Sequence, residues 1–349
     1  MKKVYTVTIP NRKFCISAFA TFALLIISNF SFAQKTWTGL GGDGLWATAT
    51  NWSGGTAPIA TDQVLLDNSG VAGSFTVTLP GGATAVSIVR LTITPTNPNI
   101  ITLALPAANT ATPGLLVGDV TGATDDIIIN SGGVIRNSSG AASGNGIQVD
   151  LAGGICRINN GGKYTHNTAR STAGIVPLLS TVAGTETGIY EYDSPGTGSI
   201  AISASGRNYG SLTLTRTVGP TGTYTATGGS ALTVRGNFII NAGVTYNSTM
   251  TGAFNLAGNL TNSGAALTLP ATQAVNFNGT STQTISGGSA ITIAGATTIA
   301  STSTTAISQA VTFNGAVAEN GAFQFDQNGI ALGTGIWTYT AGTLIFNNA

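Results

Sequence analysis

The sequence predicts an all-β protein, a right-handed parallel β-helix in which short strands stack as successive coils of a solenoid. Two recurring phrases indicate this fold. Gly-Asn followed by an apolar residue begins at Gly236 and returns at Gly258, and Ile-Asn-x-Gly begins at Ile129, Ile158 and Ile240. Phrases that return after about 20 to 30 residues are typical of solenoids, because one unit buries its apolar face only by stacking on the next. We expect roughly ten to fourteen coils at this repeat length.

Composition is the third observation that favours this fold. Glycine accounts for 48 of the 349 residues, and charged residues make up only 7%. Ordinary domains contain about 7% glycine and about 25% charged residues. Disordered chains usually combine high charge with few aliphatic residues, whereas this chain is 42% hydrophobic. An uncharged, turn-rich β-structure therefore fits better than disorder.

The residues of the recurring phrases explain how one coil forms its strands and turns. Short runs such as Phe238–Ile240 have the strand period of two and carry β-branched or aromatic side chains. Asn and Gly then follow, and both tolerate left-handed backbone angles, so the chain can turn there. A further apolar residue, for example Tyr246, begins the next strand. Stacking lets the backbone N–H and C=O groups of each strand pair with the coils above and below.

Residues 1–33 are predicted to be a secretory signal peptide. Four basic residues occupy its first part: Lys2, Lys3, Arg12 and Lys13. An apolar segment follows from about Phe14 to Phe30, and Ser31-Phe32-Ala33 matches a small-x-small cleavage site before Gln34. The alternative is an N-terminal membrane anchor. No later apolar stretch approaches the ~18 residues of a transmembrane helix, so we expect no membrane span in the mature chain.

Removal of the leader changes the charge balance. The whole chain has 13 basic and 12 acidic residues, and the basic residues of the leader are lost, so the mature chain is weakly acidic. No basic cluster remains, which argues against nucleic-acid binding. Cleavage also leaves Cys156 as the only cysteine, so no disulfide can form within the mature chain. We expect Arg157 to face solvent, which places Cys156 inward as an inert buried thiol.

Residues 34–67 differ from the rest and are predicted to form an N-terminal cap, followed by the first regular strand at 63–67. Three of the four tryptophans of the chain, Trp37, Trp46 and Trp52, lie here among many glycines. Two interpretations of these rings compete. They could form a platform on which sugar rings stack, which makes all three candidate carbohydrate-binding residues, or they could cover the open end of the solenoid. We favour the cap, because the cluster lies at a chain end that needs covering.

The same segment carries a series of short motifs. They are Thr36-Trp37-Thr38-Gly39, Gly42-Asp43-Gly44-Leu45-Trp46 and Asn51-Trp52-Ser53-Gly54-Gly55, followed by Pro58 and the apolar strand. This series resembles the opening of long secreted β-helix repeat proteins of Bacteroidota-type bacteria, and related openings occur in autotransporter-like adhesins. The phrases between 230 and 290 are similar to the repeats of the same group. The resemblance implies a secreted or surface-exposed stalk, usually without assigned enzyme activity.

Residues 68–349 are predicted to be the β-helix repeats. Strands are expected at 75–79, 86–94 and 100–105, each followed directly by a proline. The segment 170–230 is less regular, although short alternating runs continue through it. Leu344–Phe346 forms an apolar run close to the last residue, so we expect either that the chain is truncated or that a partner or a neighbouring copy covers its end.

Some β-helices degrade polysaccharides, so paired acids are candidate catalytic residues. Hydrolysis of a glycosidic bond needs two carboxylates placed across it, and Asp125-Asp126 is the only adjacent acidic pair. The single histidine, His166, lies far along the chain from this pair, so the arrangement typical of pectin hydrolases is missing. Asp119, Glu191 and Asp193 are the other clustered acids. We expect all of these acids to be solvated outer-face residues or turn formers.

Other chemistries find less support. Cys156 and His166 are poor candidates for a nucleophile and its base, because Cys156 should point inward. The chain has no CxxC motif, no histidine cluster and no P-loop. We therefore expect no catalytic residue, no metal and no cofactor.

The sequence thus favours a non-catalytic structural or adhesin-like protein, secreted or exposed on the cell surface at the outer membrane. Its expected partners are surface glycans or other cell-surface proteins. A carbohydrate-binding or polysaccharide-degrading β-helix is the main alternative. A soluble array of mixed β-sandwiches is a third possibility, and it would show antiparallel hairpins.

Overall fold

The computed structural model describes residues 33–118, 125–150, 153–182, 186–196, 198–217, 219, 221–326, 331–332, 336–339 and 343–346. The predicted signal peptide lies outside these residues except for Ala33, and Asp119 lies outside them as well. The described chain forms strands β1 to β34 and three short 3-10 turns, η1 (Ala49–Asn51), η2 (Ser53–Gly55) and η3 (Val176–Leu178). Within these ranges, no helical segment has the length and apolar character needed to span a lipid bilayer.

The longest sheet has 12 strands, and we call it the through sheet. Its strands in spatial order are β3 (Phe75–Thr78), β6 (Ile101–Leu105), β9 (Gly133–Asn137), β12 (Lys163–His166), β13 (Ile189–Tyr192), β16 (Ser211–Leu214), β19 (Phe238–Ile240), β22 (Leu260–Asn262), β25 (Thr282–Gly287), β28 (Thr304–Ile307), β31 (Ala322–Phe325) and β34 (Thr343–Phe346). Successive coils add one strand each, so the number of coils lies within the expected range.

Two further sheets belong to the first part of the chain, and we call them the early sheets. One has five strands, β1 (Ala33–Thr36), β2 (Asp62–Asp67), β5 (Arg90–Thr94), β8 (Asp125–Ile129) and β11 (Ile155–Ile158). The other has three strands, β4 (Val86–Ile88), β7 (Leu115–Val117) and β10 (Ile147–Val149).

Two sheets of seven strands, which we call the late sheets, belong to the second part. One contains β14 (Ser199–Ala201), β17 (Gly222–Ala226), β20 (Val244–Ser248), β23 (Leu267–Leu269), β26 (Ile291–Ile293), β29 (Val311–Phe313) and β32 (Ala331–Leu332). The other contains β15 (Arg207–Tyr209), β18 (Leu232–Val234), β21 (Phe254–Leu256), β24 (Val275–Phe277), β27 (Thr297–Ile299), β30 (Val317–Glu319) and β33 (Trp337–Tyr339).

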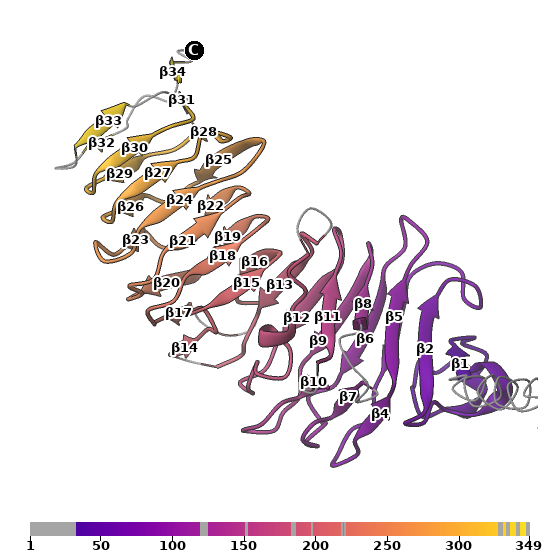
Figure 1. Cartoon of the computed structure of the whole chain (residues 1–349). Helices are drawn as coiled ribbons and strands as arrows, with labels where there is room; N and C mark the ends of the chain where they lie inside the picture. Colours follow the sequence, from indigo (N-terminus) through magenta and orange to yellow (C-terminus); the bar gives the residue numbers. More distant parts are fainter. Residues whose placement is uncertain are drawn as a thin grey trace, which may run out of the picture. The chain divides into compact units, whose positions relative to one another are not determined.

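The chain visits the sheets in a fixed order, so that equivalent strands stack coil upon coil (Figure 1). Paired strands run parallel in all five sheets. Phe238 pairs with Leu260 in the next coil, as the return of the Gly-Asn phrase predicts. The predicted parallel β-helix is therefore confirmed, and the array of antiparallel β-sandwiches is wrong.

The glycines of the two phrases serve different purposes. Gly132, Gly161 and Gly243 of the Ile-Asn-x-Gly phrase have φ angles of 78°, 82° and 79°, the left-handed region that lets the chain turn. Gly258 of the Gly-Asn phrase has no such angle. A Cβ atom there would lie 2.3 Å from the backbone of Gly236 in the preceding coil. Close contact between coils, and not a turn, requires glycine at this position.

Columns of inward side chains form the core. Val64, Leu91, Ile127 and Cys156 occupy equivalent positions of β2, β5, β8 and β11, and each is buried. A fully buried aliphatic side chain contributes about 1.5–3 kcal/mol. The strand period of two sends the intervening residues outward. Cys156 is therefore inside the core as predicted, with no exposed atom.

One expected strand is divided. Residues 86–94 form β4 and β5, which belong to different early sheets, and not one continuous strand. Val89 lies between them, and its backbone N–H donates to the Asp62 carbonyl oxygen at 2.9 Å. The chain turns a corner there while the alternating pattern of side chains continues, so the pattern alone does not reveal the corner.

The two early sheets end, and the two late sheets begin, at one level of the solenoid. β11 and β10 are the last strands of the early sheets, and only the through sheet continues without a break, from β12 to β13. The connection between β12 and β13 contains η3, and its described residues pair with the preceding coil through two isolated bridges, Asn145 to Ser171 and Cys156 to Leu179. We call this level the junction.

Candidate functional site

The three tryptophans named as candidate carbohydrate-binding residues pack against one another. Each is only 2% exposed. The ring centroids of Trp37 and Trp52 are 4.9 Å apart and those of Trp46 and Trp52 are 4.7 Å apart, both in edge-to-face geometry. Trp52 Nε1 donates to the Trp46 carbonyl oxygen at 2.7 Å. A sugar stacks on an exposed ring face, and these rings present none, so their arrangement favours the cap.

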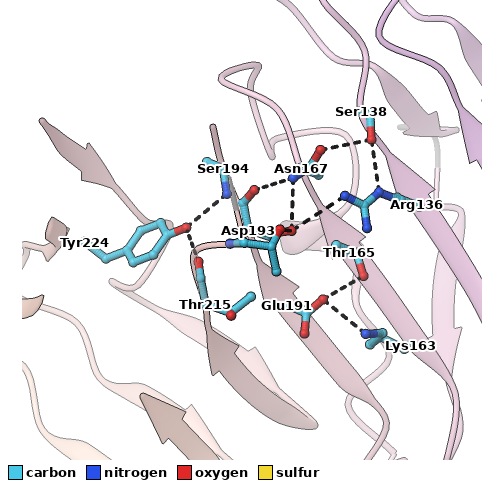
Figure 2. Close-up of polar contacts among 11 residues, drawn as sticks. Arg136, Ser138, Lys163, Thr165, Asn167, Glu191, Asp193, Ser194, Thr215 and Tyr224 are labelled. Atoms are coloured by element: carbon cyan, nitrogen blue, oxygen red, sulfur yellow. Dashed lines mark hydrogen bonds and ion pairs between the residues drawn. The ribbon is translucent and has the colours of Figure 1, made fainter. Parts of the chain in front are cut away.

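The charged residues of the repeats gather around the junction. Figure 2 shows those on the outer face of the through sheet, where β9, β12 and β13 lie side by side. Lys163 Nζ lies 3.1 Å from Glu191 Oε1, and Thr165 Oγ1 donates to the same oxygen at 3.0 Å. Thr165 and Glu191 are register partners on β12 and β13. The partly exposed ion pair between Lys163 and Glu191 therefore bridges the two coils that meet at the junction.

Asp193 lies just beyond β13, and its side chain is only 2% exposed. Its carboxylate accepts hydrogen bonds from the Thr217 amide at 2.8 Å, the Thr217 hydroxyl at 2.6 Å and Asn167 Nδ2 at 3.0 Å. Arg136 Nη2 approaches to 3.7 Å (Figure 2). The expectation of a solvated outer-face acid is wrong here, because these donors replace the water that a buried carboxylate would otherwise need.

Tyr224, in β17 of a late sheet, contacts the backbone next to Asp193. Its hydroxyl accepts from the Ser194 amide at 3.0 Å and donates to the Thr215 carbonyl oxygen at 2.9 Å (Figure 2). Burial raises the pKa of this phenol, so it stays protonated and able to donate. The hydroxyl thus satisfies one backbone group just after β13 and one just after β16.

A second charged group crosses the junction, from Arg157 in β11 through Glu186 to Arg235, which directly follows β18. Arg157 Nε donates to Asp125 Oδ2 at 2.8 Å, and Arg157 Nη1 binds Glu186, whose side chain is 2% exposed. Arg235 donates to the carbonyl oxygens of Ser180 at 2.7 Å and Val182 at 2.8 Å, and its Nη2 lies 4.0 Å from Glu186. The hydrogen bond that Arg157 donates to the Asp125 carboxylate is the main cause that raises the pKa of Arg157.

The adjacent acids at the start of β8 also differ from the expectation of solvated residues. Asp125 is paired with Arg157, and Asp126 is 3% exposed. Arg157 itself keeps 24% of its side chain exposed, so its predicted outward direction is only partly realised. These groups link coils, and the arrangement does not leave the two acids as a free pair across an open cleft.

Arg170 lies in the connection after β12 and donates hydrogen bonds to the turns of earlier coils. It is 3% exposed, and its Nη1 donates to the Ala111 carbonyl oxygen at 2.7 Å and to Ser139 Oγ at 2.6 Å. Nε donates to the Ser143 carbonyl oxygen at 3.1 Å. Burial lowers the pKa of the guanidinium. These acceptors lie in turns of two preceding coils, so one side chain ties three coils together.

Cys156 and His166 do not form a nucleophile and base. Burial raises the pKa of the Cys156 thiol, which lies within an apolar column of the core. Burial also lowers the pKa of His166 to about 4. The imidazole Nε2 lies 3.0 Å from the Arg170 carbonyl oxygen, and Nδ1 has no hydrogen-bond partner within the described ranges.

A cavity of about 200 Å³ lies beside His166. The turn after β12 supplies Thr168 and Thr172, and the region from β13 to β14 supplies Tyr192, Ser194 and Ile200. Ser194 Oγ is buried and, in the part of the chain that the structure describes, has no partner. The sequence did not single out Ser194, Arg170 or Glu186. The only signal was the loss of regular repeats between 170 and 230.

Comparison with known proteins adds nothing to this geometry: no family model, no curated protein and no solved structure matches the chain. Among the described side chains, no group of three or more His, Cys, Asp or Glu residues is placed to hold a metal ion. The junction, with its charged links and its cavity, is therefore the best candidate for a functional site.

Proposed function

We propose that the protein is a non-catalytic structural or adhesin-like β-helix, exported and displayed on the cell surface. One observation carries the proposal: among the residues that the structure describes around the junction, the clustered acids are committed to links between coils, and Cys156 and His166 are buried. Asp125 and Glu191 are paired with basic side chains. Asp193 is enclosed by donors, and Cys156 lies among aliphatic side chains.

The outer faces of the late sheets offer the contact surface that such a function needs. Thr225, Asn247, Thr268, Thr292 and Thr312 are register partners in consecutive strands of one late sheet, and all are at least partly exposed. Each coil thus presents one hydroxyl or amide at the same place. Weak contacts repeated along such a column reinforce one another when the partner is also repetitive. Surface glycans and other cell-surface proteins are partners of this kind.

The export part of the proposal is tested by producing the full chain in a Gram-negative host. We expect mass spectrometry to find a mature protein that begins at Gln34, and we expect added protease to digest it on intact cells. Replacing Ala33 by Trp, which blocks a small-x-small site, should leave the leader attached. A full-length chain that stays inside the cells would contradict the proposal.

The non-catalytic part is tested with a panel of acidic and neutral polysaccharides. We expect no release of reducing ends or of unsaturated products. Asp125→Asn and Asp126→Asn serve as matched controls for the acidic pair. Product release that disappears in either variant would show a polysaccharide-degrading enzyme and overturn the proposal.

A further inference from the structure

We propose that the junction cavity binds one neutral pyranose ring, as a free sugar or as the end of a glycan. The argument begins with two buried polar atoms, His166 Nδ1 and Ser194 Oγ, which have no hydrogen-bond partner among the described residues. An unsatisfied buried polar group costs roughly 1–3 kcal/mol. Both residues line the cavity and are at most 2% exposed. A molecule that hydrogen-bonds to both atoms would remove that cost.

The tautomer of His166 defines what the ligand must offer. Nε2 faces the Arg170 carbonyl oxygen at 3.0 Å, and a carbonyl only accepts, so Nε2 carries the proton. Nδ1 then presents a lone pair. Because burial lowers the pKa of the ring to about 4, this neutral form persists at pH 7. The ligand must therefore donate a hydrogen bond, which a hydroxyl can do and a carboxylate cannot.

The remaining walls favour a neutral ligand over a charged one. Ser171 and Thr172 contribute hydroxyl groups, and Ile200 contributes apolar surface. The hydroxyls of Thr168 and Tyr192 are already bound within the chain, to the Ser139 carbonyl oxygen and to Tyr209. Among the described wall residues, Arg170 is the one charged side chain, and its guanidinium is directed into the turns of the preceding coils. None of these described wall residues carries a carboxylate. A cation would lose its hydration without gaining a counter-charge, whereas a polyol ring has hydroxyls and apolar C–H groups for both kinds of wall.

The volume fits one ring. An engineered cavity of roughly 150 Å³ binds benzene, and this cavity measures about 200 Å³. There is room for a six-membered ring with hydroxyl substituents but not for two such rings. Ala169, Ser171 and Ala201 on its rim are exposed. The remainder of a longer glycan can therefore extend into solvent on that side.

A single histidine in the whole chain makes the test direct. Protein labelled with ¹⁵N-histidine gives one pair of imidazole nitrogen resonances in a long-range ¹H–¹⁵N spectrum. The methyl glycosides of glucose, galactose, mannose and N-acetylglucosamine are titrated in turn, with glucuronate and glucosamine as charged comparisons. We expect at least one neutral glycoside to shift the Nδ1 resonance in a saturable manner, and the charged sugars to leave it unchanged.

Two results would overturn the proposal. If none of the four glycosides moves the resonance, ordered water alone satisfies His166 and Ser194. If charged sugars bind as tightly as neutral ones, the recognition is not that of a neutral ring. Neither result bears on export or surface display, so failure here is distinguishable from failure of the proposed function.

Variants then place the sugar within the cavity, with saturation-transfer NMR on the sugar signals as the readout. Ser194→Ala removes a hydroxyl partner and should weaken binding about tenfold. Ala201→Phe narrows the rim, keeps every polar group and should abolish binding. Ser263→Ala, a matched change at an exposed serine of another coil, should bind as the unmodified protein does. Unchanged binding by both cavity variants would place the sugar elsewhere and refute the cavity site.

The two sources of the ring are separated with a trisaccharide whose non-reducing end is the sugar that binds. Equal affinity for the trisaccharide and the methyl glycoside supports recognition of a glycan end. Binding of the methyl glycoside alone supports capture of a free sugar. Both patterns support the cavity as the site.

Discussion

Two consecutive regions of the same solenoid are held together in different ways. Residues 125–235 span the junction and contain most of the charged residues outside the leader. The chain between Gly236 and Ala318 contains no Lys, Arg, Asp or Glu at all. In this second region all three sheets continue from coil to coil. Charged side chains therefore concentrate where backbone pairing stops and are absent from residues 236–318, where pairing continues in all three sheets.

The difference has a physical reason. A continuous ladder satisfies the backbone groups of every coil, and inward aliphatic and aromatic side chains need nothing more. At the junction two sheets are interrupted, and the carbonyl groups of Ser180 and Val182 there, like that of Ala111 in a turn of a preceding coil, are not paired in a strand. Arg235 and Arg170 donate to these carbonyl oxygens. Four predictions test this contrast, from the largest expected effect to the smallest.

The regular region should depend on apolar packing alone. Phe277 in β24 is 1% exposed, and Phe277→Ala should lower the free energy of unfolding by about 3–5 kcal/mol, because a large cavity remains in the core. Urea denaturation followed by circular dichroism measures the loss. We expect the same loss at low and at high salt. A strong dependence on salt would show that charge also supports this region.

The junction should depend on charge. Glu186→Gln leaves Arg157 and Arg235 without their shared carboxylate. Since both arginines are partly exposed, we expect a loss of about 2 kcal/mol, below the full cost of breaking a buried pair. Hydrogen exchange should increase first in β11 and β18, where the two arginines lie, and the coils from β21 onward should be unchanged. Uniform destabilisation of all coils would contradict the separation of the two regions.

Stability should fall as the medium becomes acidic, and the effect should begin at the junction. His166 has a pKa of about 4 in the folded chain, below its ordinary 6.5, so the unfolded chain binds a proton first. The contribution of the neutral His166 to the free energy of unfolding is complete above about pH 6.5 and is lost as the pH falls toward 4. We expect a loss of about 2 kcal/mol between pH 7 and pH 5. The same denaturation series on His166→Gln should be nearly flat over that range, and a persisting slope would assign the effect to another group.

Hydrogen bonds between polar side chains on the outer face should contribute least to the free energy of unfolding. Asn276 Nδ2 donates to Asn255 Oδ1 at 2.8 Å between neighbouring coils. Asn276→Ala should cost about 0.5 kcal/mol, because cross-strand pairs at an exposed face contribute little. Lys163→Ala should remove a similar amount at the junction, and only there should high salt reduce the difference. Thermal unfolding of both variants in parallel measures these losses of stability. A loss larger than that for Glu186→Gln would contradict the proposed order of effects.

The sequence predicts the regular region well because each coil repeats the same local chemistry. The turn glycines, the pairing of Phe238 with Leu260 and the inward direction of Cys156 all follow from the phrases and from the strand period. These features depend only on neighbours within one coil or in the adjacent coil. The Gly-Asn glycine is the exception, because its need for close contact appears only once two coils are stacked.

The contacts at the junction could not be predicted from the sequence in the same way. Asp193 was expected to be a solvated outer-face residue or a turn former, and its burial depends on Thr217 and Arg136, which are remote in sequence. Ser194 is one of many serines, and nothing local distinguishes it. The sequence shows where regularity is lost, but the partners that replace the ladder come from several coils at once.

The through sheet acquires a mechanical role from the break in its neighbours. It alone carries an unbroken series of backbone hydrogen bonds past the junction. A force that pulls the two ends of the stack apart is resisted there by that series on one side and by arginine side chains on the others. The arginine contacts are fewer and independent of one another, so they should yield first, and the through sheet would then act as the hinge line about which the two halves open.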